Sequence, residues 1–222
     1  MPNDKIMALS WQQLSAGQGG KRRPPLTRPA IRARLAGNGW DKADLDMLYV
    51  SSLADMPDGV ARLKPSHLIS LLAPQELPPT PPGVASQQHL KVAIDDICEP
   101  MDGQVHPEDG HIEEILSFAA GWDRARPLLV HCYAGVSRSM ATALILLCLE
   151  SRGREAEVAS LISARAPHAH PNRLMVAIAD RLLGCDGRLQ AAVEAMPLPD
   201  YSGIGPIVTL PSRLPSLRAP VD

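Results

Sequence analysis

Short apolar runs alternate with amphipathic stretches along the middle of the chain. Runs of this length are typical of buried strands, and they are followed by segments whose apolar residues recur at helical spacing. Strands that alternate with helices in this way predict βαβ units, so we expect an α/β fold with a central, mostly parallel sheet flanked by helices. The expected strands are Met47–Val50, His67–Leu72, Leu90–Ile94 and Pro127–His131.

The helices are predicted from apolar spacing and from the residues at their ends. The segment Arg138–Glu150 is apolar nearly all round, which predicts a central, buried helix. Asn172 is a good N-cap for a later helix, and Gly184 is a good stop for it. The other expected helices are a short one that begins near Asp55, then His111–Trp122, Glu155–Arg165, Arg173–Leu183 and Asp186–Ala195.

The two ends of the chain differ from its middle. Residues 1–46 include a basic, proline-rich stretch, and residues 196–222 hold many prolines with little periodicity. Both patterns are typical of disordered segments, so we expect one folded domain over residues 47–195 between disordered tails. Two further hypotheses concern the first segment: that it is a basic arm for an anionic partner, and that translation begins at Met47.

Composition narrows the class of protein. The chain has 222 residues, of which 45% are hydrophobic, and a formal net charge of −2, which argues against general nucleic-acid binding. Its four cysteines form no CxxC pair, so a reducing, cytoplasmic setting is expected rather than a disulfide framework. The longest apolar run, Met140 to Leu149, is too short to span a bilayer, and no membrane partner is expected.

Candidate chemistry gathers where the strand Pro127–His131 meets the helix that follows it. Cys132 comes directly after the strand, and Arg138 stands at the start of the helix. A helix N-terminus offers unpaired N–H groups and positive potential, and a tight loop of successive N–H groups forms a similar anion nest. Gly135 permits the turn that such a nest needs, and Arg138 supplies a planar fork for two phosphate oxygens.

The same positive field favours the thiolate form of Cys132, which makes the sulfur a nucleophile next to a bound anion. Ser139 is placed to donate a hydrogen bond to that sulfur, and His131 to fix the loop through backbone hydrogen bonds. The alternative is an inert buried cysteine before an ordinary capped helix. That interpretation leaves Gly135 and Arg138 unexplained.

The pattern His131-Cys132-x5-Arg138-Ser139 resembles the signature of the cysteine-dependent protein tyrosine phosphatase superfamily. The form Cys-x-Ala-Gly-x-Ser-Arg-Ser is similar to the dual-specificity branch and its short bacterial relatives. The resemblance implies that Cys132 is the nucleophile and that Ser139 assists its release. It also implies that phosphate is bound by Tyr133, Ala134, Gly135, Val136, Ser137 and Arg138.

A general acid is expected after the strand Leu90–Ile94. Cleavage of a phosphate ester needs a proton for the leaving oxygen, and a positioned carboxylic acid can give it. In the dual-specificity enzymes this acid lies on a loop after a strand, and Asp96 matches that place better than Asp95, the alternative. The nearby Cys98 is interpreted as a small buried residue, with a resolving thiol for Cys132 as the other possibility.

The segment Pro171-Asn172 also resembles the family pattern before its last helix. His168 and His170, next to it, are interpreted as solvent-facing residues rather than metal ligands. The chain lacks a counterpart of the aromatic phosphotyrosine-recognition loop of the large tyrosine-specific enzymes. It also lacks a clear glutamine that would position the hydrolytic water.

The resemblance implies a phosphoester hydrolase, most simply a protein tyrosine or dual-specificity phosphatase that forms a phosphocysteine and needs no metal or other cofactor. Its partner would be a phosphorylated protein or a small phosphoester. Two alternatives stay open. One is a phosphate-binding module without catalysis, and the other is a different thiolate-loop enzyme, such as a sulfurtransferase or an arsenate reductase that uses Cys98.

Overall fold

The computed structural model describes residues 46–199 and 203–214. The expectations for residues 1–45, including the basic arm, lie outside the described residues, as do residues 200–202 and 215–222 of the predicted C-terminal tail. The described part holds one five-stranded sheet in the order β3-β2-β4-β1-β5. The strands are β1 (Asp46–Ser51), β2 (His67–Leu72), β3 (His89–Ala93), β4 (Leu128–His131) and β5 (Val208–Pro211).

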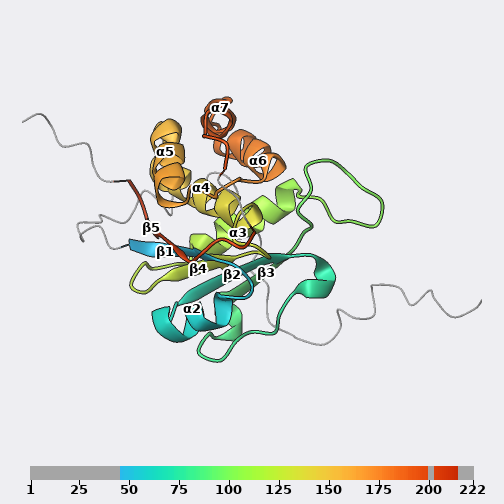
Figure 1. Cartoon of the computed structure of the whole chain (residues 1–222), viewed down its shortest axis with the longest axis vertical. Helices are drawn as coiled ribbons and strands as arrows, with labels where there is room; N and C mark the ends of the chain where they lie inside the picture. Colours follow the sequence, from blue (N-terminus) through green and yellow to red (C-terminus); the bar gives the residue numbers. More distant parts are fainter. Residues whose placement is uncertain (1–45, 200–202, 215–222) are drawn as a thin grey trace, which may run out of the picture.

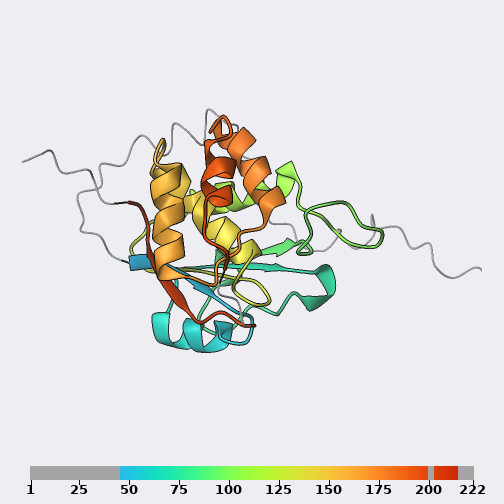
Figure 2. The same cartoon turned by 45° about the horizontal axis from the view of Figure 1, so that its top comes forward.

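The first four strands run parallel to one another, and β5 alone pairs antiparallel, with β1. Helix α2 (Met56–Leu63) lies on one face of the sheet, as Figures 1 and 2 show from two directions. The other helices cover the opposite face (Figure 1). This confirms the predicted α/β fold with a mostly parallel sheet. The helices of the opposite face are α3 (Asp109–Ala119), α4 (Arg138–Glu150), α5 (Glu155–Arg165), α6 (Arg173–Leu183) and α7 (Arg188–Glu194).

Alternating side chains of the strands fill two hydrophobic clusters. On the side of the five helices, Val50, Leu71 and Val130 pack into the large core. On the side of α2, Leu68 and Leu129 pack into a smaller cluster that also holds Val84, from the loop between β2 and β3. That loop contains two short 3₁₀ helices, η1 (Pro74–Glu76) and η2 (Ser86–Gln88). It therefore shields the second face of the sheet together with α2.

Helix α4 lies at the centre of the large core, and every residue from Arg138 to Leu149 is buried. Burial on all sides explains why its sequence is apolar nearly all round. Because α4 directly follows the loop after β4, its N-terminus is held rigidly at the end of the central strand. The start of α6 is fixed by its N-cap, because the Asn172 side chain accepts a hydrogen bond from Met175 N (3.0 Å).

The predicted disordered tail over residues 196–222 is wrong for the part that contains β5. Val208 and Leu210 are buried in the large core, and Leu214 N donates to Ser151 Oγ (3.0 Å). A four-residue strand gives little periodicity, and Pro211 is tolerated because β5 is an edge strand. In the described ranges, no helix is both long and apolar enough to cross a membrane.

Candidate active site

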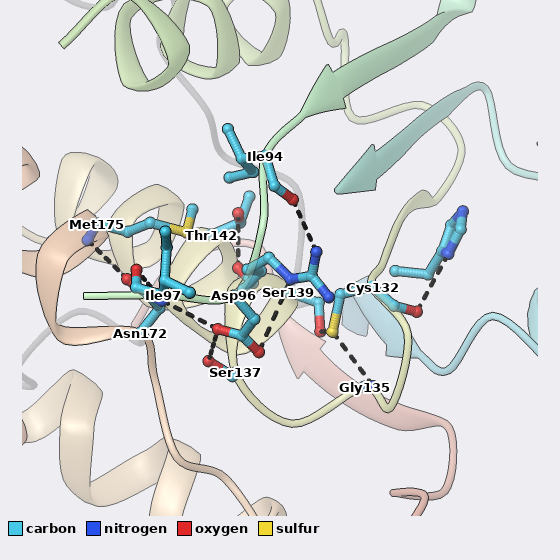
Figure 3. A network of polar contacts seen from close by, with 12 residues as sticks. Ile94, Asp96, Ile97, Cys132, Gly135, Ser137, Ser139, Thr142, Asn172 and Met175 are labelled. Atoms are coloured by element: carbon cyan, nitrogen blue, oxygen red, sulfur yellow. Dashed lines mark hydrogen bonds and ion pairs between the residues drawn. The ribbon is translucent and has the colours of Figure 1, made fainter. Parts of the chain in front are cut away.

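The loop between β4 and α4 closes around the sulfur of Cys132 (Figure 3). Cys132 is only 1% exposed, yet its sulfur has polar neighbours. The Ser139 hydroxyl lies 3.1 Å from Sγ, and Gly135 N donates to Sγ over 3.3 Å. Both contacts stabilise negative charge on sulfur, because each can direct a hydrogen toward it.

Three carbonyl groups of this loop are held away from the sulfur. Each accepts a hydrogen bond from a backbone N–H of a different segment that is distant in the chain. Since a trans peptide places its C=O and N–H on opposite sides, the following N–H groups turn toward the inside of the loop. The three bonds are Leu53 N to Tyr133 O (3.0 Å), Gly205 N to Ala134 O (2.8 Å) and His170 N to Val136 O (3.0 Å).

The inward N–H groups form an anion nest next to the positive end of α4. One of them is already in use, because the N–H that follows the Ala134 carbonyl is that of Gly135, which contacts the sulfur. Gly135 has a φ of +75°, and a Cβ there would lie 2.9 Å from Ser51 C and Ser52 N. Glycine is thus required both for the turn and for the close approach of the β1 end.

Arg138 extends from the first position of α4 and is 5% exposed. Its Nη1 donates to Ile94 O (2.7 Å), which fixes the guanidinium against the end of β3. Its Nε is buried and has no hydrogen-bond partner among the described residues, and it lies 3.7 Å from Asp96 Oδ2. An oxyanion in the nest would satisfy this donor and would match the planar fork of the guanidinium.

Asp96 lies at the mouth of the loop with its side chain 37% exposed. Its Oδ1 accepts from Ser137 Oγ (2.6 Å) and from Asn172 Nδ2 (2.9 Å), as Figure 3 shows. Asp95 is used differently: both its backbone N–H and its carboxylate bind the backbone of Val105. Of the two candidate acids, the structure therefore brings Asp96 to the loop and ties Asp95 to the following segment.

His131, at the end of β4, is fully buried, and its Nδ1 lies 3.4 Å from Cys132 O. Burial lowers the pKa of His131 to about 4, so the imidazole is neutral near pH 7. The carbonyl can only accept, and Nδ1 therefore carries the proton. His131 thus supports a fourth carbonyl of the loop, as the sequence predicted.

These groups surround one pocket of about 580 Å³. Most of the predicted phosphate-binding residues line it, while Gly135, Ser139 and His131 support the loop from behind. The exposed Cys98 also lines this pocket, so the expectation that Cys98 is buried is wrong. The lining residues are Glu76, Asp96, Cys98, Cys132, Tyr133, Ala134, Val136, Ser137, Arg138, His170, Pro171, Asn172, Arg173 and Pro199.

Sequence reasoning missed the contribution of residues after 195. Pro199 lines the pocket, and Gly205 binds the loop backbone. His168, expected at the surface, is buried under Gly205, and burial lowers its pKa. These contacts involve backbone atoms or small residues, which leave no recognisable motif.

The comparison with curated proteins agrees with this geometry. The chain is 30% identical over 140 residues to dual specificity protein phosphatase 15 of Mus musculus and, equally, to that of Rattus norvegicus. Over this stretch the chain is similar to dual-specificity phosphatases. The match covers 61% of this chain and 54% of each relative, so the chain spans about half the length of these proteins. No family model matches the chain.

Several solved structures resemble this chain at low sequence identity. A crystal structure of DUSP15 is 21% identical, with 69% of this chain and 94% of that chain covered and a TM-score of 0.48. Human DUSP28 is 23% identical, with 62% and 88% covered and a TM-score of 0.47. TpbA of P. aeruginosa is 19% identical, with 68% and 88% covered and a TM-score of 0.39.

Proposed function

We propose that this chain hydrolyses phosphomonoesters through a phosphocysteine on Cys132, as a protein tyrosine or dual-specificity phosphatase. The observation that carries the proposal is the convergence of three groups on one pocket. Cys132 with its sulfur, Arg138 and the carboxylate of Asp96 all line it. The Nε of Arg138 makes no hydrogen bond among the described residues and lies 3.7 Å from Asp96 Oδ2. A nucleophile, a fixed cation and a proton donor are the groups that phosphoryl transfer needs.

In the first step the Cys132 thiolate attacks phosphorus in line, and the bond from phosphorus to the leaving oxygen breaks. Asp96 gives its proton to that oxygen, which departs as an alcohol or a phenol. Arg138 and the inward N–H groups stabilise the three equatorial oxygens. Asn172 and Ser137 hold Asp96 above the loop at hydrogen-bond distance.

In the second step a water molecule attacks the phosphocysteine, and Asp96, now ionised, accepts a proton from it. Inorganic phosphate leaves, and the electron pair of the broken S–P bond returns to sulfur. The Ser139 hydroxyl, 3.1 Å from Sγ, stabilises the thiolate that forms. The chain's own donors supply the positive charge in both steps.

A phosphorylated protein or a small phosphoester is the proposed substrate class. The pocket is wide, and Tyr133, which lines it, is 56% exposed. A thiolate nucleophile works only while it stays reduced, which supports a reducing, cytoplasmic compartment. All four cysteines are free thiols. The catalytic unit proposed here runs from β1 through residue 214, because β5 completes the sheet.

The test is hydrolysis of p-nitrophenyl phosphate by the full chain, with inhibition by vanadate. Cys132→Ser is expected to abolish turnover and to keep phosphate binding. Asp96→Ala is expected to lower kcat on an alkyl phosphate by about 10²–10⁴, the usual range for a general acid. Asp95→Ala is the matched control, since Asp95 binds Val105 instead. Full activity of Cys132→Ser would refute the assignment of Cys132 as the nucleophile.

Arsenate and thiosulfate serve as competing substrates in the same assay. Cys98 lies in the pocket with Cys132, so a reductase reaction has a second thiol at hand. The proposal expects turnover of the phosphoester to exceed both by orders of magnitude and to survive Cys98→Ser. Faster reduction of arsenate, lost in Cys98→Ser, would replace the proposed function.

A further inference from the structure

A chain of hydrogen bonds, buried except at its Thr80 end, runs from the loop 77–85 to the backbone of Cys132, across three neighbouring strands. Ser70 of β2 is the register partner of His131 in β4, and His89 begins β3 on the other side of β2. All three side chains are buried. The contacts are Thr80 Oγ1 to His89 Nδ1 (2.9 Å), His89 Nε2 to Ser70 Oγ (2.7 Å) and Ser70 Oγ to His131 Nε2 (2.6 Å).

The donor and the acceptor of each bond can be assigned by starting from the carbonyl of Cys132, at the end of the chain of bonds. Cys132 O accepts, so His131 carries its proton on Nδ1. Burial lowers the pKa of His131 and of His89 to about 4, so both rings are neutral near pH 7. His131 Nε2 must then accept from the Ser70 hydroxyl, which has only one hydrogen. Ser70 accordingly accepts from His89 Nε2–H, and Thr80 donates to His89 Nδ1.

All four bonds thus point the same way, with each donor aimed toward Cys132. Aligned hydrogen bonds polarise one another, and the effect is stronger in a buried site of low dielectric. The last donor, His131 Nδ1–H, holds the Cys132 carbonyl away from the inside of the loop. Three other loop carbonyls are held outward by backbone N–H groups, whereas this one depends on a side-chain relay.

We propose that Ser70, His89 and Thr80 are positioning residues for the phosphate-binding loop, which act through His131 to keep the Cys132 carbonyl turned outward and the sulfur ready to ionise. The proposal rests on the proposed function for its kinetic readout. Its second readout is alkylation of Cys132, which needs no turnover.

The charged surroundings stay constant in the variants used for the test. Arg138 lies near His131 and Lys91 near His89, and each opposes protonation of its histidine. A substitution at Ser70 or Thr80 changes neither charge. A change in the pH dependence of Cys132 alkylation in these variants therefore reports the loss of the relay. The charged or titratable groups that line the Cys132 pocket are Glu76, Asp96, Cys98, Tyr133, Arg138, His170 and Arg173.

The test compares Ser70→Ala with Ser66→Ala in the full chain. Ser66 is also buried, and its hydroxyl contacts Arg126 O (3.3 Å) and His67 Nδ1 (3.0 Å). These contacts lie at the start of β2 and β4, whereas the relay reaches the end of β4. We expect Ser70→Ala to lower kcat/KM for p-nitrophenyl phosphate about tenfold, the worth of one hydrogen bond. Cys132 in the full chain is also alkylated with iodoacetamide, and the modified peptide is quantified by mass spectrometry. In Ser70→Ala the rise of the alkylation rate with pH should occur at a higher pH than in the wild type. Ser66→Ala should leave both readouts unchanged at a similar loss of Tm.

Thr80 supplies a second test in which misfolding is not a concern, since Thr80 is half-buried at the far end of the relay. Thr80→Val replaces the hydroxyl with a methyl group of similar size, and it should shift both readouts in the same direction, by less. Thr80→Ser keeps the hydroxyl and should leave both readouts at the wild-type level. Unchanged kcat/KM and unchanged alkylation in both Ser70→Ala and Thr80→Val would overturn the proposal. If the wild-type chain has no phosphatase activity, the proposed function fails, and alkylation still decides the relay.

Discussion

The backbone N–H of Gly205 donates to the carbonyl oxygen of Ala134 over 2.8 Å, and so joins the C-terminal segment to the loop between β4 and α4. The contact is possible because Gly205 passes directly over the ring of His168. From there the chain continues into β5, which adds an antiparallel edge to β1. The C-terminal segment is therefore part of the candidate active site, although it follows the last helix.

Gly205→Ala should destabilise the protein and weaken its loop. The added Cβ would collide with the His168 imidazole, and such overpacking costs about 1–3 kcal/mol. We expect a Tm several degrees lower and weaker vanadate binding. Gly110→Ala is the control, because outside its chain neighbours and the backbone of its own helix no described atom lies within 4 Å of its new Cβ. Adding His168→Ala to Gly205→Ala should recover much of the loss, and no recovery would contradict the proposed clash.

Gly135→Ala should abolish phosphate binding, because the new Cβ would lie 2.9 Å from the backbone of Ser51 and Ser52. Gly153→Ala is the control that measures the cost of the positive φ alone. Gly153 has a φ of +77°, close to the +75° of Gly135, with nothing within 4 Å of an added Cβ. Gly153→Ala should cost only about 1–2 kcal/mol of left-handed strain and keep vanadate affinity. Equal losses of affinity in the two variants, by calorimetry, would show that close approach is irrelevant.

Asn172 has two roles that one substitution can separate. Its Oδ1 caps α6, and its Nδ2 donates to Asp96 and to Ile97 O. Asn172→Asp keeps the cap but puts a second carboxylate against Asp96, so kcat should fall at least tenfold with little change in Tm. Asn172→Ala loses both roles and should also cost about 1 kcal/mol of stability. Wild-type kcat in Asn172→Asp would mean that Asp96 needs no support from α6.

The stability of the fold should fall in mild acid. Burial lowers the pKa of His89 and of His131 to about 4, below the 6.5 of the unfolded chain. The unfolded state therefore binds more protons between these values. The stabilisation is complete above pH 6.5 and is lost as the pH falls toward 4. We expect Tm to drop over this window and the drop to be smaller in His89→Gln, with the exposed His170→Gln as control.

Much of the fold and of the loop could be predicted because the signals are local. The bounds of β2 were predicted as observed, since an apolar run flanked by Pro65 and Pro74 is short and clearly delimited. The cap of α6 and its stop at Gly184 follow from the chemistry of single residues. The contacts of Ser139 and His131 with the Cys132 segment were likewise predicted from their neighbouring positions.

The rest depends on contacts between distant segments. The pairing of β5 with β1 is decided by burial against the core, and its four residues alone show no alternation that would reveal it. The donors that hold the carbonyls of Tyr133, Ala134 and Val136 are backbone N–H groups, which every residue except proline carries. Cys98 was expected to be buried because most free cysteines are, but its position on the loop after β3 leaves it exposed.

Rapid-quench analysis of the loop peptide would detect the proposed phosphocysteine on Cys132 itself. The full chain is mixed with a phosphoester, quenched in acid within the first turnover, digested and examined by mass spectrometry. We expect a transient phosphate on Cys132 that forms and decays at rates consistent with turnover and is missing in Cys132→Ser. Turnover without phosphate on Cys132, or with phosphate on another residue, would contradict it.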